Sequence, residues 1–251
     1  MRLRIEKLTK YYGNKCVLKG IDIEFHGGET VAIVGVNGVG KTTLLECLAQ
    51  IRLSDSGRIM IDDEVLDRQR IDLRRRLAYL PGVPDPVFGT PLTYFCSTLA
   101  AYGHSLSSHA TIPEDLVELI TRFEIEKLVR QPWSSLSRGQ QYKALVVSLL
   151  AVDPEIWLLD EPFSAGMDPL GIRQWRSAIR EAVEQRQRIV VFSTQNLEVA
   201  ARAADRVVIL HNQKIVASVP TIELLQGNST ENLDENFEKL LRDASEAEPF
   251  R

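Results

Sequence analysis

Long apolar runs are missing from this sequence. The longest candidate, ALVVSLLAV at 144–152, has nine residues, whereas a membrane-spanning helix needs about 20. The first ten residues, MRLRIEKLTK, lack the apolar segment of a signal peptide. We therefore expect a cytoplasmic protein, for which any membrane role would need another polypeptide.

Cysteine is scarce, and neither sign of charge dominates. Cys16, Cys47 and Cys96 are far apart and outside any C-x-x-C pattern, so we expect free thiols in a reducing compartment. The net charge of −4 gives no reason to expect nucleic acid, and we predict no nucleic-acid partner. The basic run RQRIDLRRR at 68–76 is expected to be a solvated face, with a nucleic-acid patch as the alternative.

What is present is ordinary globular composition. The chain has 251 residues, of which 44% are apolar and 25% charged. Such a chain can bury one large core or form two modest lobes. The motifs therefore have to decide the function.

The strongest motif is VAIVGVNGVGKTTLLECLA at 31–49. A short apolar strand leads into a glycine-rich turn and then into helix-forming residues. The spacing matches G-x-x-x-x-G-K-[S/T], in which backbone N–H groups and a helix N-terminus surround phosphate oxygens. The lysine of this pattern reaches the terminal phosphates, and the next hydroxyl ligates Mg²⁺. A glycine turn that contains Lys-Thr by chance is the alternative. The predicted phosphate-binding residues are Gly35, Asn37, Gly38, Gly40, Lys41, Thr42 and Thr43.

A second apolar strand, IWLLDEP at 156–162, ends in two acids. In a parallel sheet the ends of neighbouring strands meet at one edge, which would place Asp160 beside the phosphate loop. Asp160 is then a predicted Mg²⁺ ligand together with Thr42. Glu161 would turn toward the γ-phosphate and accept a proton from the attacking water. A strand end that faces solvent is the alternative.

The stretch LSRGQ at 136–140 comes directly before a helix whose apolar residues nearly surround it, which predicts a buried helix. Ser137 and Gln140 have the spacing of a capping box. The same N-terminal amides, with Ser137 and Gly139, could instead bind a γ-phosphate. The two interpretations are compatible, and Ser137, Gly139 and Gln140 are predicted nucleotide-binding residues.

The order of these motifs, followed by SAGMD at 164–168 and the triplet STQ at 193–195, resembles the ATP-binding subunit of a bacterial ABC transporter. This resemblance implies an α/β fold, namely a P-loop ATPase core with an antiparallel β edge and an inserted helical subdomain. Residues 1–82 and 153–220 would form the core, and residues 83–152 would form the helical subdomain with the signature motif. The proline- and glycine-rich stretch 81–91 independently suits a linker.

The resemblance also implies cofactors, partners and location. It suggests that Tyr12 stacks on the adenine of ATP, with Tyr11 as an alternative, and that Mg²⁺ accompanies the nucleotide. The family works as a head-to-tail dimer of two ATPase subunits, identical or different, in which Asp168 belongs to a loop that crosses the interface. A separate transmembrane permease subunit would hold this chain at the inner face of the cell membrane.

Three positions depart from the family pattern. Arg138 replaces the usual glycine of the signature, Gly82 stands where a glutamine is usual, and Gln195 replaces a histidine that contacts the γ-phosphate. Glutamine can donate to a phosphate oxygen or orient water, but it cannot become cationic. We therefore predict Glu161 and Gln195 as the catalytic residues of a slow ATPase.

The C-terminal segment is predicted to be helical. Apolar residues recur at helical spacing in 221–251, which predicts an amphipathic C-terminal helix that packs on its own core or on a partner. The predicted function is ATP binding and hydrolysis that power a membrane transporter through dimer closure. The alternatives are a regulatory switch with little turnover and a soluble ABC ATPase in translation or DNA repair.

Overall fold

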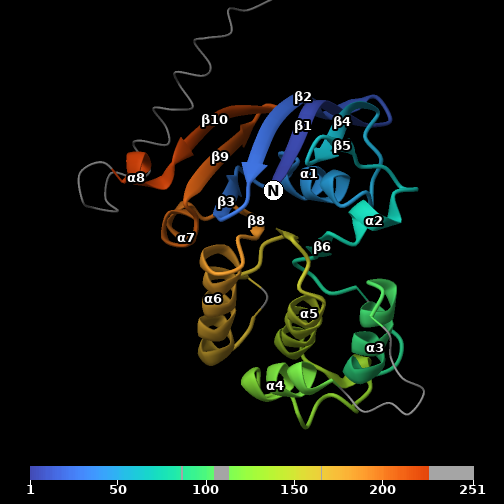
Figure 1. The fold of residues 1–251 in the computed structure, drawn as a ribbon. Helices are drawn as coiled ribbons and strands as arrows, with labels where there is room; N and C mark the ends of the chain where they lie inside the picture. The colour runs from blue at the N-terminus through green and yellow to red at the C-terminus, as the bar shows by residue number, and fades with distance from the viewer. Residues whose placement is uncertain (86, 105–112, 165, 226–251) are drawn as a thin grey trace, which may run out of the picture.

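The computed structural model describes residues 1–85, 87–104, 113–164 and 166–225. Its strands form two sheets (Figure 1), one of six strands in the order β10-β9-β3-β8-β7-β6 and one of four in the order β2-β1-β4-β5. The strands are β1 (Arg2–Tyr12), β2 (Lys15–His26), β3 (Glu29–Val34), β4 (Ser56–Ile61), β5 (Glu64–Val65), β6 (Leu77–Leu80), β7 (Ile156–Leu159), β8 (Ile189–Thr194), β9 (Arg206–His211) and β10 (Lys214–Pro220).

The six-stranded sheet is parallel except at one edge, where β10 pairs antiparallel with β9. Every residue of β7 and β8 is buried, which explains why their sequences are continuously apolar rather than alternating. β8 lies between β3 and β7. The residues that follow these three strands therefore meet at one edge of the sheet.

The four-stranded sheet is antiparallel and lies over one face of the first. The side chains of Leu3, Ile5 and Leu8 in β1 are buried, and the pairing register shifts between Ile5 and Leu8, where Lys7 has a φ of 50°. The shift is a β-bulge that keeps the inward face apolar over an odd number of residues. Together with α1 (Lys41–Leu48), these side chains form an apolar cluster against the large sheet.

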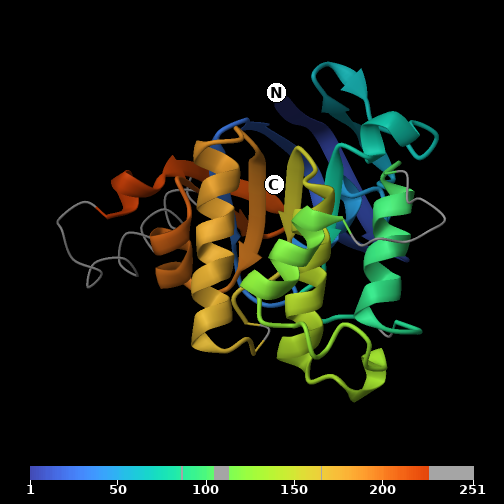
Figure 2. The ribbon, with the colours of Figure 1, turned by 60° about the horizontal axis from the view of Figure 1, so that its bottom comes forward.

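Helices cover the other face of the large sheet. α3 (Pro91–Ala101), α4 (Glu114–Arg122) and α5 (Arg138–Val152) gather at the bottom of Figure 1, and α6 (Pro169–Glu184) stands beside α5 in both views (Figure 2). α5 is buried at nearly every position from Tyr142 onward, as predicted. The remaining helices are α2 (Ile71–Arg74), α7 (Leu197–Ala203), α8 (Thr221–Leu224) and a 3-10 turn at Trp133–Ser135.

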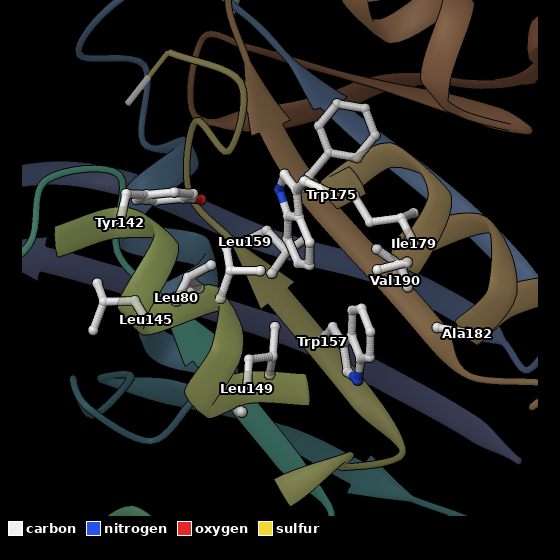
Figure 3. Packing of buried hydrophobic residues seen from close by; sticks show 14 of the residues in the cluster. Leu80, Tyr142, Leu145, Leu149, Trp157, Leu159, Trp175, Ile179, Ala182 and Val190 are labelled. Carbon is white, nitrogen blue, oxygen red and sulfur yellow. The ribbon is translucent and has the colours of Figure 1, made fainter. Parts of the chain in front are cut away.

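Paired tryptophans join the sheet to these helices. Trp157 of β7 and Trp175 of α6 stack with their ring centroids 5.8 Å apart and their planes 7° apart, and Leu149 of α5 belongs to the same apolar cluster (Figure 3). Burial of such large rings is a major source of core stability. The α/β fold with an antiparallel β edge and inserted helices is confirmed, and its division at residues 82 and 152 stays a prediction.

Two predictions concern the chain end and the membrane. The apolar positions of the predicted C-terminal helix, Leu233, Phe237, Leu240 and Leu241, lie outside the described residues. Within the described ranges, no helix is long and apolar enough to span a bilayer.

Candidate functional site

The phosphate loop follows β3 and leads into α1. Gly40 precedes the helix with a φ of 116°, and Gly38 has a φ of 77°, values that strongly favour glycine. An ideal Cβ at Gly40 would lie 3.1 Å from the carbonyl oxygen of Val17. The first turn of α1 holds no acidic side chain. The helix N-terminus is therefore free of a competing anion and suited to phosphate.

Lys41 is buried inside this loop. Its Nζ donates to the carbonyl oxygens of Gly35, at 2.7 Å, and Val36, at 3.2 Å. Burial lowers the pKa of Lys41, while the nearby carboxylates of Glu161 and Asp160 act to raise it. The amine is thus fixed within the loop and close to both acids of the second motif.

Asp160 follows β7 and forms hydrogen bonds with residues of α1 and β8. Its Oδ2 accepts a hydrogen bond of 2.8 Å from the Thr42 hydroxyl, and its Oδ1 accepts one of 2.5 Å from the Ser193 hydroxyl. The predicted pairing of Thr42 with Asp160 is therefore present in the structure. A carboxylate beside a hydroxyl is an oxygen donor set that suits Mg²⁺, which completes its octahedron with water and phosphate oxygens. The described residues hold no cluster of three or more His, Cys, Asp or Glu for a different metal.

Glu161 turns away from the strand, with a φ of 45°. Its backbone N–H donates to Ser193 Oγ at 3.0 Å. Ser164 Oγ donates to the Glu161 carbonyl oxygen at 2.8 Å and, at the longer distance of 3.4 Å, to its carboxylate. Burial raises the pKa of Glu161, whereas Lys41 and the backbone N–H of Gln195 act to lower it. A half-buried carboxylate with a raised pKa, beside a phosphate loop, has the properties of a general base.

The start of α5 is a complete capping box. Ser137 Oγ accepts from the N–H of Gln140 at 3.3 Å, and Gln140 Oε1 accepts from the N–H of Ser137 at 2.9 Å. Gly139 lies against another loop, since an ideal Cβ there would be 2.3 Å from the carbonyl oxygen of Gly166. Among the described residues, the side-chain hydrogen bonds of Ser137 and Gln140 stay within this capping box. The capping interpretation is confirmed, and phosphate binding at this turn stays a prediction.

A family model for ABC transporters matches residues 18–164, more than half of the chain. The chain belongs to the ABC transporter family. A putative ABC transporter ATP-binding protein of Clostridium perfringens (strain 13 / Type A) is 28% identical over 233 residues, which cover 91% of this chain and 78% of the relative. The sulfate/thiosulfate import ATP-binding protein CysA of Synechocystis sp. is 31% identical over 220 residues, 86% of this chain and 59% of the relative. The chain therefore spans less than two thirds of the CysA length.

The solved structures agree with the family assignment. The structure of an ATP-binding subunit of an ABC transporter matches with a TM-score of 0.85 and 27% identity, over 96% of this chain and 100% of that one. The predicted resemblance to the ATP-binding subunit of an ABC transporter is confirmed. The chain is an ABC-type ATPase.

Two predicted nucleotide contacts of this ABC domain lie at the edges of the loop. The Tyr12 hydroxyl is 3.5 Å from Thr43 Oγ1, and the cationic groups of Lys10 and Arg52 lie within 6 Å of its exposed ring, at 5.8 and 5.5 Å. An exposed ring next to the phosphate loop is available for stacking on a base. Asn37 instead lines a hollow of about 230 Å³ between the loop tip and residues 211–213.

The two departures from the ABC pattern on this side of the sheet differ in their surroundings. The side chain of Gln195 is exposed after β8 and makes no hydrogen bond within the described part of the chain. Gly82 lies against the second motif, because an ideal Cβ there would be 2.7 Å from the carbonyl oxygen of Asp160. A glutamine at position 82 would therefore require the chain to shift.

Sequence reasoning missed Ser193. No role is predicted for it from the sequence, yet its hydroxyl donates to Asp160 and accepts from the N–H of Glu161. The signal was its completely buried position at the end of an apolar strand that neighbours both motif strands. A buried hydroxyl needs hydrogen-bond partners. The Asp160 carboxylate and the Glu161 N–H group lie at the same edge of the sheet and provide them.

Proposed function

We propose that this chain binds ATP with Mg²⁺ at the joined ends of β3, β7 and β8 and hydrolyses it to power a membrane transporter. The observation that carries the proposal is the Asp160 carboxylate, held by Thr42 on one side and Ser193 on the other, with Glu161 following it. This arrangement supports the proposal because carboxylate and hydroxyl oxygens, a buried amine and a second carboxylate lie close together.

Each residue has a defined part in the proposed reaction. The loop N–H groups from Gly35 to Thr43 and the Lys41 amine bind the phosphates, and Tyr12 stacks on the base. Thr42 and Asp160 would hold Mg²⁺, which would supply positive charge to stabilise the negative charge of the phosphates. Glu161 accepts a proton from the attacking water, and Gln195 orients that water or donates to the γ-phosphate.

A second copy or a different ATPase subunit would complete the site. Ser137, Gly139 and Gln140 of one subunit then face the γ-phosphate held by the other, so that ATP closes the dimer and hydrolysis opens it. The capping box supports this role because it fixes the turn while leaving the Ser137 side chain exposed.

A separate transmembrane permease subunit would dock beside the linker 81–91, at the inner face of the membrane. A groove of about 390 Å³ lies between α1, α2, β6 and the C-terminal end of α3, and Ile51 and Ile71 at its edge are about half exposed. Exposed apolar side chains around a groove are typical of protein contacts. Import is the activity named for the Synechocystis relative, and the direction and substrate here would be set by the permease.

Two measurements test the proposal. The purified chain should hydrolyse ATP in the presence of Mg²⁺, and the Glu161→Gln variant should still bind ATP and form a dimer that ADP does not support. Size-exclusion chromatography with light scattering reports the dimer. A dimer without turnover in the unmodified chain would favour the regulatory switch that Gln195 suggests, and the absence of both would remove the transport proposal.

Identification of the partner distinguishes a transporter subunit from a soluble ATPase. Purification from native membranes should recover a permease chain with this subunit. Recovery with ribosomes or DNA instead would favour the role in translation or DNA repair.

A further inference from the structure

Three charged side chains are buried among the described residues, namely Lys41, Lys143 and Asp160. Lys41 and Asp160 belong to the nucleotide site, but Lys143 has no part in the reaction proposed above. It lies in the second turn of α5, is 6% exposed, and is followed directly by four buried apolar residues, 144–147. Because burial of a charge is unfavourable unless it is paired, a buried lysine at this position needs an explanation.

Its partner is Asp168, at the start of α6. Lys143 Nζ lies 2.5 Å from Asp168 Oδ2. The other carboxylate oxygen, Oδ1, accepts a hydrogen bond of 2.7 Å from the N–H of Gly171 and so caps α6. The Lys143 ammonium and this N–H group lower the pKa of Asp168. One carboxylate therefore links α5 to the first turn of α6.

The Lys143 side chain packs against the first turn of α6. An ideal Cβ at Gly171 would lie 2.7 Å from Lys143 Cε, so a larger residue at 171 would displace the ammonium. One turn earlier on α5, Gly139 lies against the carbonyl of Gly166. Residues 139 and 143 are four apart and therefore lie on the same face of the helix.

We propose that Lys143 is a positioning residue that holds the segment Gly166–Asp168 against the signature turn, so that both parts of one subunit move as a unit. The inference rests on the proposed dimer, in which both parts face the partner. Binding of the partner's ATP at Ser137 and Gly139 is then transmitted to Asp168 and to the start of α6 through the ion pair and the glycine contact.

The test uses near-isosteric variants in the Glu161→Gln background, which is expected to form a stable ATP dimer. Lys143→Met removes the charge and keeps the chain length. Asp168→Asn removes the charge and keeps a good helix cap. Each variant should weaken the ATP-dependent dimer at least about 10-fold, and the double variant should be no weaker than either single one. Lys143→Arg should restore most of the dimer.

The controls separate position from stability. The affinity of the single subunit for ATP should change less than about 2-fold in each variant, because no described contact joins Lys143 to the phosphate loop. Asp168→Asn guards against a folding defect, since its side chain is half exposed and its cap is retained.

A double variant whose effect equals the product of the two single effects, or an unweakened dimer in both single variants, would overturn the inference while the proposed function stands. Failure of the background itself to dimerise with ATP would refute the proposed closure, and the inference with it.

Discussion

The protonation state of Glu161 should control the acid side of the pH–rate profile. Burial raises its pKa, and a base acts only when deprotonated, so the rate should fall as the pH drops through this raised value. The fall should therefore occur above the ordinary glutamate pKa of about 4.3. Measurement of kcat/KM for ATP between pH 5 and pH 8 checks the position of the acid limb.

Ser164→Ala provides the matched change for this pH experiment. Its hydroxyl donates to the Glu161 carboxylate and lowers that pKa. Loss of the hydroxyl should move the acid limb to still higher pH. A limb that stays in place, or that moves toward lower pH, would argue that Glu161 is not the titrating base.

Gln195 and Gly82 require different tests because their surroundings differ. The Gln195 side chain is exposed, so Gln195→His changes the chemistry with little effect on packing. A histidine that can become cationic should contact the γ-phosphate more strongly, and turnover should rise several-fold. Steady-state ATPase rates of the purified transporter measure this, and no rise would count against a slow enzyme limited at this position.

Gly82→Gln is instead expected to lower stability. Its Cβ would approach the carbonyl of Asp160 to 2.7 Å, and backbone cannot yield as a flexible side chain does. The sequence alone identified position 82 as unusual, but only the packing explains why glycine fits there. The unfolding temperatures of both variants check this difference. Gly82→Gln should unfold at a lower temperature than the unmodified chain, whereas Gln195→His should not.

At the scale of elements, Ser137 allows the two interpretations of the α5 N-terminus to be separated. Ser137→Asp keeps a good helix cap, but it places a carboxylate where the partner's γ-phosphate is proposed to bind. Stability should be unchanged within about 0.5 kcal/mol, while ATP-dependent dimerisation should be lost. Ser137→Ala should instead lower the free energy of unfolding by about 1 kcal/mol and should weaken ATP-dependent dimerisation less than Ser137→Asp does.

Thermal unfolding and light scattering on both variants provide the measurement. If Ser137→Asp dimerised with ATP as well as the unmodified chain, the turn would be a cap and nothing more. The comparison depends on the capping hydrogen bond between Ser137 Oγ and the N–H of Gln140, which is present in the structure.

Elements with a strong local signal could be predicted from the sequence. β3, β7 and β8 are short apolar runs that end in polar residues, and α5 is apolar on every side, so their type and burial follow from pattern alone. The bulge near Lys7 and the contact of Gly139 with Gly166 could not be predicted. Both depend on which segments pack together, and no local pattern encodes that.

At the scale of the whole molecule, the site is assembled from segments far apart in the sequence. Thr42, Asp160 and Ser193 meet because β8 lies between β3 and β7. The sequence supplied the first two through motif spacing and missed Ser193, because a lone serine at a strand end has no spacing to recognise. Burial is what distinguishes it.

The same scale explains the basic run 68–76. Arg68, Arg74 and Arg75 donate to backbone carbonyls of Ile51, Arg68 and Ala101, and among the described residues none of the three has a carboxylate partner. Arg74 and Arg75 line the groove of about 390 Å³ between α2, β6 and the C-terminal end of α3. An apolar groove bordered by unpaired guanidinium groups suits an amphipathic segment with acidic side chains.

Charge reversal at this groove should therefore release the subunit from the proposed permease. In Arg74→Glu/Arg75→Glu, the fraction recovered with native membranes should fall at least about 10-fold, since two attractive contacts become repulsive. The ATPase activity of the purified chain should be unchanged, because the two arginines are remote from Asp160 in the hydrogen-bond network. Arg173→Glu is the matched control, as Arg173 is exposed on α6 and has no carboxylate partner in the described ranges. If both variants lost membrane recovery equally, overall charge rather than this groove would hold the subunit at the membrane. Loss confined to the double variant would assign the contact to Arg74 and Arg75.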